Sequence, residues 1–307
     1  MLAGKDILTT KQFSMEELDL VLSTAAGFER ALKERSILNN LEGCIMASLF
    51  FEASTRTRLS FEAAALRLSG RVISMPEAAV SSLAKGESIA DTAKTVDGYA
   101  DVIVIRHALK GSAQTAADYA IHPVINGGDG AGQHPTQALL DLYTIFKEEG
   151  RVSGLTITLL GDLKNGRTVH SLSYLMAKYG NRMIFASPPS LAMPPEITAE
   201  LRELGAGVVE TSDAEAAMAE SDIVYVTRIQ RERFEDPAEY ERVKGSYIID
   251  MKAIQRAKKG IKVMHPLPRV DEIATEVDSY EGATYFRQAH NSIPTRMALL
   301  ALVTGRV

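Results

Sequence analysis

The stretch CIMASLFFEASTRTRLSFEAAALRLSGRVIS, residues 44–74, decides the fold. It begins with a continuous apolar run at 44–51, which is typical of a strand that is buried on both faces. A helix is expected from about residue 57 to residue 69, and the next short apolar run begins at 72–74. A strand, a helix and a second strand in this order indicate a parallel sheet that is covered by helices.

The same alternation continues along the chain. Further strands are expected at 102–105, 123–126, 155–160, 183–186, 208–210, 223–226, 247–250 and 261–264. Helical patterns separate nearly all of them, which is the doubly wound α/β class. The sequence predicts two doubly wound parallel-sheet domains of similar size, one at 1–133 plus 291–307 and one at 134–290. A helix at 136–149 is expected near the boundary, and a last helix at 293–303 is expected to pack back on the first domain.

Composition excludes several classes of protein. The chain has 307 residues, a formal net charge of −5, 46% hydrophobic residues and 24% charged residues, as in an ordinary soluble globular protein. The mild acidity argues against a nucleic-acid binder or a membrane-surface binder. The single cysteine, Cys44, cannot form an internal disulfide and fits a reducing compartment. No apolar run is long enough for a membrane span and no signal-peptide pattern is present, so we expect a cytoplasmic protein.

The residues that follow each expected strand are the candidates for function, because ligands of open α/β sheets bind beyond the carboxyl ends of the strands. These residues are rich in cations and hydrogen-bond donors. In the first half they are Ser54, Thr55, Arg56, Thr57, Arg58, Arg106, His134 and Gln137. In the second half they are Arg167, Arg228, Gln230, His265, Pro266, Leu267 and Pro268. The pattern predicts a site for a small, highly anionic ligand, although scattered solvated arginines are an alternative.

Residues 54–58 are the sharpest element, because they open a helix directly after a strand. The N–H groups of a first helical turn and the helix dipole together form a phosphate-binding site. Ser54, Thr55 and Thr57 add hydroxyl groups, and Arg56 adds a planar fork that suits phosphate oxygens. A plain Ser or Thr cap with surface arginines is the alternative interpretation.

A second loop, GDLKNGRT at 161–168, also follows a strand and opens a helix. It resembles a P-loop, but Arg167 stands where a lysine is required, and the third glycine of a dinucleotide fingerprint is missing. No nicotinamide or flavin cofactor is therefore expected, and Arg167 suits a carboxylate better. The 6 histidines show no metal-ligand spacing, so no metal is expected either.

In their order and spacing, these motifs closely resemble the aspartate/ornithine carbamoyltransferase family, on its aspartate side. The stretches that carry the resemblance are 54–58, 81–87, 134–137, 161–168, 228–230 and 265–268. The resemblance implies transfer of the carbamoyl group of carbamoyl phosphate to the amine of L-aspartate, giving N-carbamoyl-L-aspartate and phosphate, in pyrimidine synthesis. Ornithine or another amino acid as acceptor is one alternative. A phosphate-binding or P-loop-like nucleotide module without transferase activity is another.

The resemblance also implies roles for individual residues. Those for carbamoyl phosphate are Ser54, Thr55, Arg56, Thr57, Ser81, Lys85, Arg106, His134, Gln137, Pro266 and Leu267. Those for aspartate are Lys85, Arg167, Arg228, Gln230 and Leu267, and the catalytic ones are Thr57, Lys85, Arg106 and His134. In this family Ser81 and Lys85 enter the site from a neighbouring subunit, which implies a homotrimer. The sequence leaves open whether Ser82 takes the place of Ser81 and whether separate regulatory chains attach.

The residues of the second half favour aspartate over ornithine as the acceptor. Aspartate has two carboxylates, and Arg167 and Arg228 supply matching cations. The cationic chain of ornithine would instead require an acidic partner. By resemblance, ornithine enzymes typically carry a cysteine beside the late histidine, where this chain has Pro266.

Overall fold

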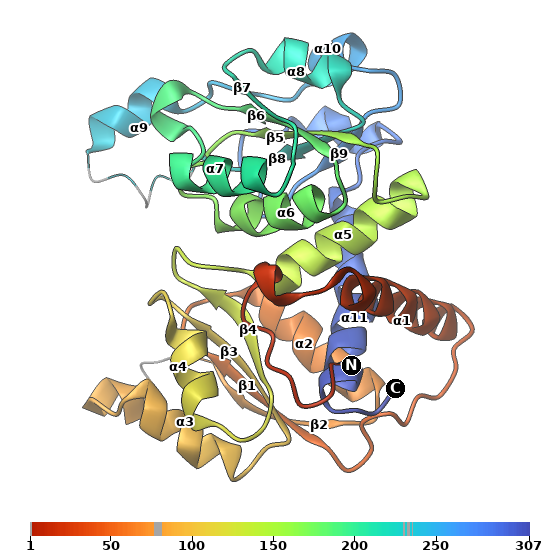
Figure 1. Cartoon of the computed structure of the whole chain (residues 1–307), viewed down its shortest axis with the longest axis vertical. Coiled ribbons are helices and arrows are strands. Elements are labelled where there is room, and N and C mark those ends of the chain that lie inside the picture. The colour runs from red at the N-terminus through yellow and green to blue at the C-terminus, as the bar shows by residue number, and fades with distance from the viewer. Residues whose placement is uncertain (1, 77–81, 230, 232–233, 235) are drawn as a thin grey trace. The chain divides into compact units, whose positions relative to one another are not determined.

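The computed structural model describes residues 2–76, 82–229, 231, 234 and 236–307. Its internal contacts divide the chain into two compact units (Figure 1). Unit 1 comprises Met1–Tyr143 and Asn291–Val307, and unit 2 comprises Thr144–His290. Each unit contains one parallel sheet with helices, which confirms the predicted fold class. The domain boundary expected after residue 133 stays a prediction.

The sheet of unit 1 has 4 parallel strands in the order β2-β1-β3-β4. They are β1 (Ile45–Phe50), β2 (Arg71–Met75), β3 (Val102–His107) and β4 (Val124–Asp129). The helices that belong wholly to this unit are α1 (Met15–Lys33), α2 (Thr55–Arg67), α3 (Ile89–Asp97) and α4 (Ser112–Tyr119), with short 3-10 turns η1 (Thr10–Gln12) and η3 (Ser82–Lys85). The chain moves from β1 outward to β2 and then returns to β3 on the other side of β1. The carboxyl ends of β1 and β3 therefore form the topological switch point, where ligands bind in such sheets.

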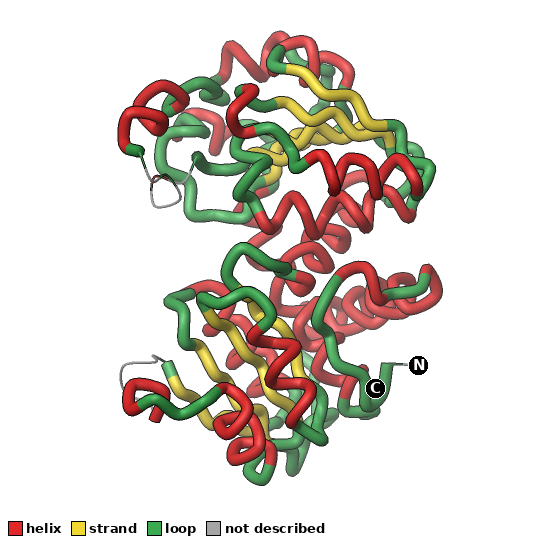
Figure 2. Tube along the Cα trace, turned by 60° about the vertical axis from the view of Figure 1, so that its left-hand side comes forward, coloured by secondary structure: helices red, strands yellow, loops and turns green. Residues whose placement is uncertain are grey.

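The sheet of unit 2 has 5 parallel strands in the order β7-β6-β5-β8-β9. Figure 2 shows the strands of this sheet side by side, with helices around them. They are β5 (Thr156–Leu160), β6 (Arg182–Ala186), β7 (Val208–Thr211), β8 (Ile223–Val226) and β9 (Lys262–Met264). Around them lie α6 (Arg167–Lys178), α7 (Pro195–Glu203), α8 (Ala214–Glu220), α9 (Pro237–Val243) and α10 (Met251–Arg256), with 3-10 turns η4 (Pro189–Leu191) and η6 (Thr275–Ser279). The switch point of this sheet lies between β5 and β8.

Two helices carry the chain from one unit to the other. α5 spans Pro135–Glu149 and α11 spans Tyr285–Val303, and the unit boundaries fall inside both of them. The C-terminal part of α11 packs on unit 1, as expected: the Arg296 guanidinium donates to the Ser60 hydroxyl of α2, and the Val303 carbonyl accepts a hydrogen bond from the Gly4 N–H at 2.8 Å. No helix among the described residues is long and apolar enough to cross a membrane.

Three expectations about elements need correction. The expected strand at 247–250 is wrong: Ile249 forms only an isolated bridge with Ile273, because Asp250 already caps α10 by accepting the Ala253 N–H. α11 begins at Tyr285, eight residues before the expected start at 293, because the helix continues through Pro294 instead of beginning beside it. α2 begins at Thr55, two residues before the expected start at 57.

Candidate active site

The first turn of α2 lies directly beyond the end of β1. Ser54 is the N-cap residue of this helix, has an extended backbone and makes no side-chain capping hydrogen bond. Thr57 is buried within the first turn. Partial burial lowers the pKa of Arg56 below its ordinary value, although a guanidinium stays charged at neutral pH. The first-turn N–H groups therefore receive no cap from Ser54, which is the arrangement of a helix start that binds an external anion.

Arg106 lies at the end of β3, beside the end of β1. Phe50 pairs with Arg106 in the sheet register, and Arg106 is only 8% exposed. One terminal nitrogen of its guanidinium, Nη1, donates to the Gly127 carbonyl at 3.0 Å, and the other, Nη2, lies 3.3 Å from Glu52 Oε1. The guanidinium is thus held at the switch point of the unit 1 sheet, next to the loop that leads into α2. The sequence indicated Arg106, but not its acidic partner Glu52.

His134 and Gln137 lie at the start of α5, beyond the end of β4. His134 is 4% exposed, and its carbonyl accepts the N–H groups of Gln137 at 3.1 Å and Ala138 at 3.2 Å, which begins the helix. The Gln137 amide donates to Asp141 Oδ1 at 2.8 Å, one turn further along. Asp141 is fully buried and was missed by the sequence analysis, in which only residues that directly follow strands were candidates.

The structure thus groups the unit 1 candidates at the ends of three neighbouring strands, with one exception. Ser54 follows β1, Arg106 lies at the end of β3 and His134 follows β4, and these strands are adjacent in the sheet. Lys85 instead follows β2, the edge strand, and is exposed at the end of η3. Ser81, the uncertain member of the same loop, lies outside the described residues.

In unit 2 the loop at 161–168 joins β5 to α6. Gly161 has a φ of +116°, and a Cβ at this position would lie 2.3 Å from the Thr227 carbonyl oxygen, so only glycine fits between the ends of β5 and β8. Asp162 is fully buried, and its Oδ1 accepts the Asn165 N–H at 2.9 Å. Burial raises the pKa of Asp162, and the hydrogen bonds from Asn165 oppose that rise. The loop is therefore organised around its own carboxylate.

Arg167 and Arg228 lie on the two sides of the unit 2 switch point. Arg167 is the first residue of α6, after β5, and Arg228 is the second residue after β8. Both side chains are half-buried. Gln230, two residues further, lies outside the described residues. Two cations at one switch point suit a ligand with more than one carboxylate.

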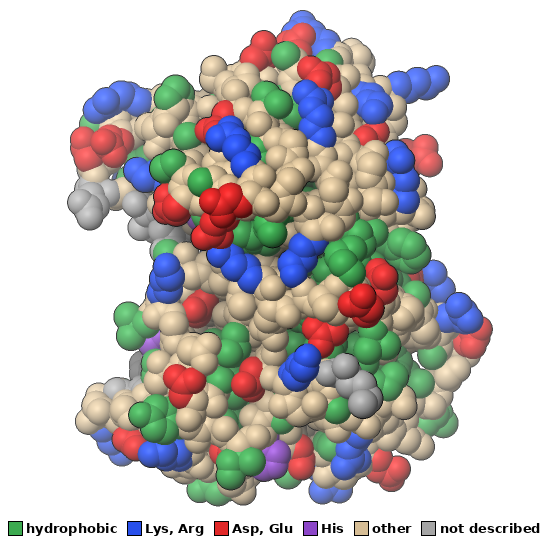
Figure 3. Space-filling view, in the orientation of Figure 1, with side chains coloured by type: hydrophobic (Ala, Val, Ile, Leu, Met, Phe, Trp, Pro, Cys, Tyr) green, Lys and Arg blue, Asp and Glu red, His purple; other side chains and the backbone are tan. Residues whose placement is uncertain are grey.

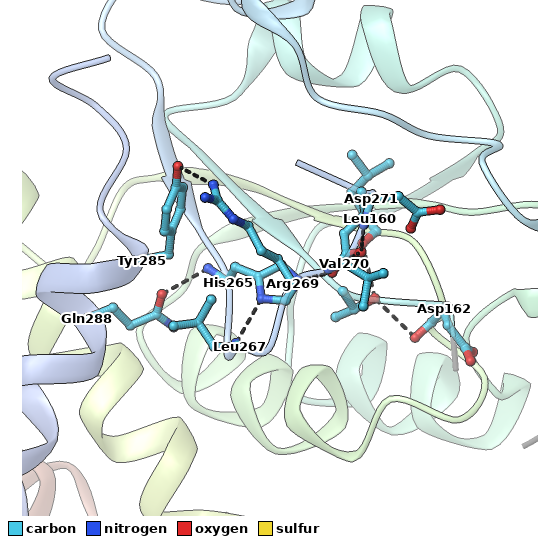
Figure 4. Close-up of polar contacts among 11 residues, drawn as sticks. Leu160, Asp162, His265, Leu267, Arg269, Val270, Asp271, Tyr285 and Gln288 are labelled. Atoms are coloured by element: carbon cyan, nitrogen blue, oxygen red, sulfur yellow. Dashed lines mark hydrogen bonds and ion pairs between the residues drawn. The ribbon is translucent and has the colours of Figure 1, made fainter. Parts of the chain in front are cut away.

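Beyond β9, His265 organises the backbone of the segment that contains Pro266 and Leu267 (Figure 4). His265 is 1% exposed, its Nε2 lies 2.6 Å from Glu272 Oε1, and its Nδ1 accepts the Leu267 N–H at 2.8 Å. Its own N–H donates to the Gln288 side chain at 2.9 Å. Burial is the largest single influence and acts to raise the pKa of Glu272, but the hydrogen bond and charge of His265 and the backbone hydrogen bonds together outweigh it, and the pKa is lowered. The importance of Glu272 was not visible in the sequence.

The remaining titratable groups do not suggest a different kind of site. Across the described parts of the chain, His, Cys, Asp and Glu side chains do not gather in groups of three that could hold a metal ion. Cys44 is buried just before β1, as its apolar surroundings in the sequence suggested. On the face drawn in Figure 3, basic and acidic side chains are intermixed.

Comparison with known proteins covers both units. A family model described as "Aspartate/ornithine carbamoyltransferase, carbamoyl-P binding domain" matches residues 5–147. A second, described as "Aspartate/ornithine carbamoyltransferase, Asp/Orn binding domain", matches residues 153–303. The helix start at Ser54 lies within the first match, and the pair Arg167 and Arg228 lies within the second.

Individual relatives extend over nearly the whole chain. The aspartate carbamoyltransferase catalytic subunit of Thermococcus kodakarensis is 55% identical over 302 residues, covering 98% of this chain and 97% of the relative. A crystal structure of aspartate transcarbamoylase from Trypanosoma cruzi in complex with N-(phosphonacetyl)-L-aspartic acid superimposes with a TM-score of 0.94 at 42% identity, covering 98% of this chain and 96% of that one. The catalytic subunit of M. jannaschii aspartate transcarbamoylase superimposes with a TM-score of 0.90 at 47% identity, covering 97% of each chain. The resemblance seen in the sequence is confirmed, and the chain belongs to the aspartate/ornithine carbamoyltransferase family.

Proposed function

We propose that the chain is the catalytic chain of an aspartate carbamoyltransferase. It transfers the carbamoyl group of carbamoyl phosphate to the amine of L-aspartate, which commits the product to pyrimidine synthesis. The observation that carries the proposal is that each unit places cations at its own switch point: Arg106 beside an uncapped helix start in unit 1, and Arg167 with Arg228 in unit 2. Relatives named aspartate carbamoyltransferase at 55% and 52% identity support the same reaction.

Carbamoyl phosphate is assigned to the residues of unit 1. The first turn of α2, with Ser54, Thr55, Arg56 and Thr57, holds the phosphate through N–H groups, hydroxyls and a guanidinium. A Trypanosoma cruzi aspartate transcarbamoylase that is 42% identical has been crystallised in complex with carbamoyl phosphate. The carbamoyl amide is assigned to Gln137 and to the carbonyls of Pro266 and Leu267.

The reaction needs no covalent intermediate with the protein. The neutral amine of aspartate attacks the carbonyl carbon, the bond from that carbon to the phosphate oxygen breaks, and the departing phosphate takes the proton of the amine. Negative charge develops on the carbonyl oxygen before the bond breaks, so donors aimed at that oxygen lower the barrier. Thr57, Arg106 and His134 are assigned this role, and all three are buried in unit 1. Burial strengthens their interaction with the developing charge, since little water competes there.

Aspartate is assigned to Arg167, Arg228 and Gln230. Each arginine offers a planar fork that matches a carboxylate, and holding two anionic substrates together requires cations on both. The acceptor test is a purified-protein assay with aspartate and ornithine in parallel. Carbamoyl aspartate is the expected product. Equal or faster carbamoylation of ornithine would overturn aspartate specificity, and tight ATP binding without any carbamoyl product would favour a nucleotide-binding module instead.

We also propose that the active assembly is a homotrimer in the cytoplasm, with Lys85 and Ser81 supplied by a neighbouring subunit. The exposure of Lys85 beyond the edge strand β2 supports this, because it leaves the side chain accessible to another copy of the chain. Mixing an Arg56→Ala chain with a Lys85→Ala chain should restore part of the activity, since some sites then receive both residues intact. Mixtures that stay inactive under proven subunit exchange would contradict sharing. The native mass, measured with and without co-expressed partners, tests whether regulatory chains attach.

A further inference from the structure

We propose that His265 and Glu272 act as a positioning pair that fixes the backbone of Leu267 for recognition of the carbamoyl amide. The inference rests on the proposed function, because that function assigns the amide to the carbonyls of Pro266 and Leu267. Neither His265 nor Glu272 contacts the substrate in this proposal. Their proposed effect is transmitted through the peptide backbone of Leu267.

The two ring nitrogens of His265 have opposite hydrogen-bonding roles: Nε2 donates and Nδ1 accepts. Glu272 Oε1 lies 2.6 Å from Nε2, and the lowered pKa of Glu272 keeps its carboxylate ionised, so that it can only accept a hydrogen bond. Nε2 therefore carries the proton. Nδ1 then has a lone pair, and it accepts the Leu267 N–H at 2.8 Å. Glu272 thus selects the one neutral tautomer of His265 that can hold Leu267. Figure 4 shows the contact between His265 and Leu267.

Glu272 is itself held in place. Its second oxygen, Oε2, accepts the N–H groups of Val270 at 3.1 Å and Asp271 at 3.2 Å. His265 and Glu272 are 1% and 6% exposed, so bulk water does not replace either partner. The main chain of His265 is anchored separately, by its N–H bond to Gln288 at 2.9 Å. Glu272 is therefore held by backbone N–H groups and His265 by a side chain of unit 2.

Leu267 needs such support because of its backbone conformation. Its φ is +56°, in the left-handed region, which is unfavourable for a residue with a branched side chain. This conformation sets the directions of the neighbouring carbonyl groups. The hydrogen bond from the Leu267 N–H to His265 closes a tight loop two residues long and holds the chain in this geometry. A displacement of about 1 Å in a substrate-positioning group can lower a rate about 100-fold.

The test compares His265→Leu with His265→Asn in the full-length protein. Leucine removes the acceptor for the Leu267 N–H, whereas the asparagine side-chain oxygen can accept an N–H two residues further along the chain. We expect His265→Leu to lower kcat about 100-fold, and His265→Asn to recover a substantial part of that loss. Glu272→Gln is the second variant, because its amide cannot accept hydrogen bonds on both sides. We expect Glu272→Gln to lower kcat, as His265→Leu does.

A second measurement separates positioning from a loss of stability. Inhibition constants are measured for phosphonoacetamide, which carries an amide, and for inorganic phosphate, which does not. We expect His265→Leu and Glu272→Gln to raise the inhibition constant of phosphonoacetamide about tenfold. The inhibition constant of phosphate should stay unchanged, because the phosphate contacts belong to α2. His122→Leu is the matched control: it breaks another histidine–carboxylate contact, 3.1 Å from Asp97, and should change neither constant.

The outcomes distinguish the inference from the function on which it rests. If the wild-type chain forms no carbamoyl aspartate, the proposed function is wrong and the inference is overturned with it. If the wild type is active and both His265→Leu and Glu272→Gln keep its kcat and its preference for phosphonoacetamide over phosphate, the inference alone is overturned. A lower melting temperature without a change in that preference would also overturn it, since that result is what a purely structural pair predicts.

Discussion

The loops at 54–58 and 161–168 occupy equivalent places in the two units, but the carboxylates near them form different contacts. Each follows a central strand at a switch point, and each opens a helix whose N-cap residue makes no side-chain capping bond. In the second loop the buried carboxylate of Asp162 accepts the Asn165 N–H at 2.9 Å. In the first, Ser54 accepts no such bond, and the nearby carboxylate of Glu52 pairs with Arg106 instead.

This difference shows that the spacing of a strand, a loop and a helix start does not by itself make a phosphate site. The N–H groups of such a loop and helix start are available to an external anion only where the protein does not already bond them. The loop at 161–168 has the spacing of a P-loop, but Asp162 already holds one of its N–H groups, and Arg167 replaces the lysine. The structure therefore adds a second physical reason to assign phosphate to unit 1 and carboxylates to unit 2.

Arg106→Ala is expected to have the largest effect. It removes a buried cation and leaves the Glu52 carboxylate without its guanidinium partner, close to the proposed phosphate site. We expect kcat/KM for carbamoyl phosphate to fall about 100- to 1,000-fold. Steady-state kinetics measure this. Arg182→Ala, which breaks only an exposed pair with Glu220, is the control and should retain wild-type kinetics. A loss below tenfold for Arg106→Ala would contradict its role.

His134→Ala tests whether the donor to the carbonyl oxygen acts independently of the phosphate contacts in unit 1. We expect kcat to fall about 100-fold, because a donor to the developing oxyanion is lost. Inhibition by inorganic phosphate should stay at the wild-type level, since the phosphate is assigned to the first turn of α2. A large loss of carbamoyl phosphate affinity at unchanged kcat would refute this assignment.

Asp162→Ala tests the loop at 161–168 in unit 2, the second of the two loops compared. The substitution leaves the Asn165 N–H without its acceptor in a buried loop, so we expect the free energy of unfolding to fall by about 1–3 kcal/mol. The aspartate KM should rise, because Arg167 begins the helix that this loop supports. Phosphate inhibition should not change. Urea unfolding and substrate kinetics measure these effects, and a variant weakened mainly in phosphate inhibition would invalidate the contrast between the two loops.

The sequence predicted the parts of the molecule that depend on local pattern. The parallel strands, the presence of a helix opened by residues 54–58 and the positions of Arg106 and Arg228 follow from apolar runs and from the residues that end them. The partners Glu52, Asp141 and Glu272 could not be predicted in this way. Asp141 lies one helical turn after Gln137, and Glu272 lies seven residues after His265 in an irregular segment. Their importance comes from burial and from contacts formed on folding.

The same distinction between local and tertiary effects explains two of the three expectations that needed correction. The run at 247–250 has the composition of a strand, but Asp250 already caps the next helix, so only Ile249 forms a bridge. Proline is often the first residue of a helix, yet here Pro294 lies well inside α11. The packing of α11 on unit 1, through Arg296 and Val303, stabilises the helix on the far side of the proline. Local preference was overridden by tertiary contacts.

The smallest expected effect comes from comparing two serines that precede helices in unit 1. Ser14 caps α1 by accepting the Glu17 N–H at 3.2 Å, whereas Ser54 makes no cap bond to α2. Ser14→Ala should therefore lower the free energy of unfolding by about 1 kcal/mol and leave phosphate inhibition unchanged. Ser54→Ala should do the opposite, with unfolding unchanged within about 0.5 kcal/mol and weaker phosphate inhibition. If Ser54→Ala instead destabilised the protein as much as Ser14→Ala, its hydroxyl would be an ordinary cap, and the claim that this helix start is reserved for a substrate anion would fail.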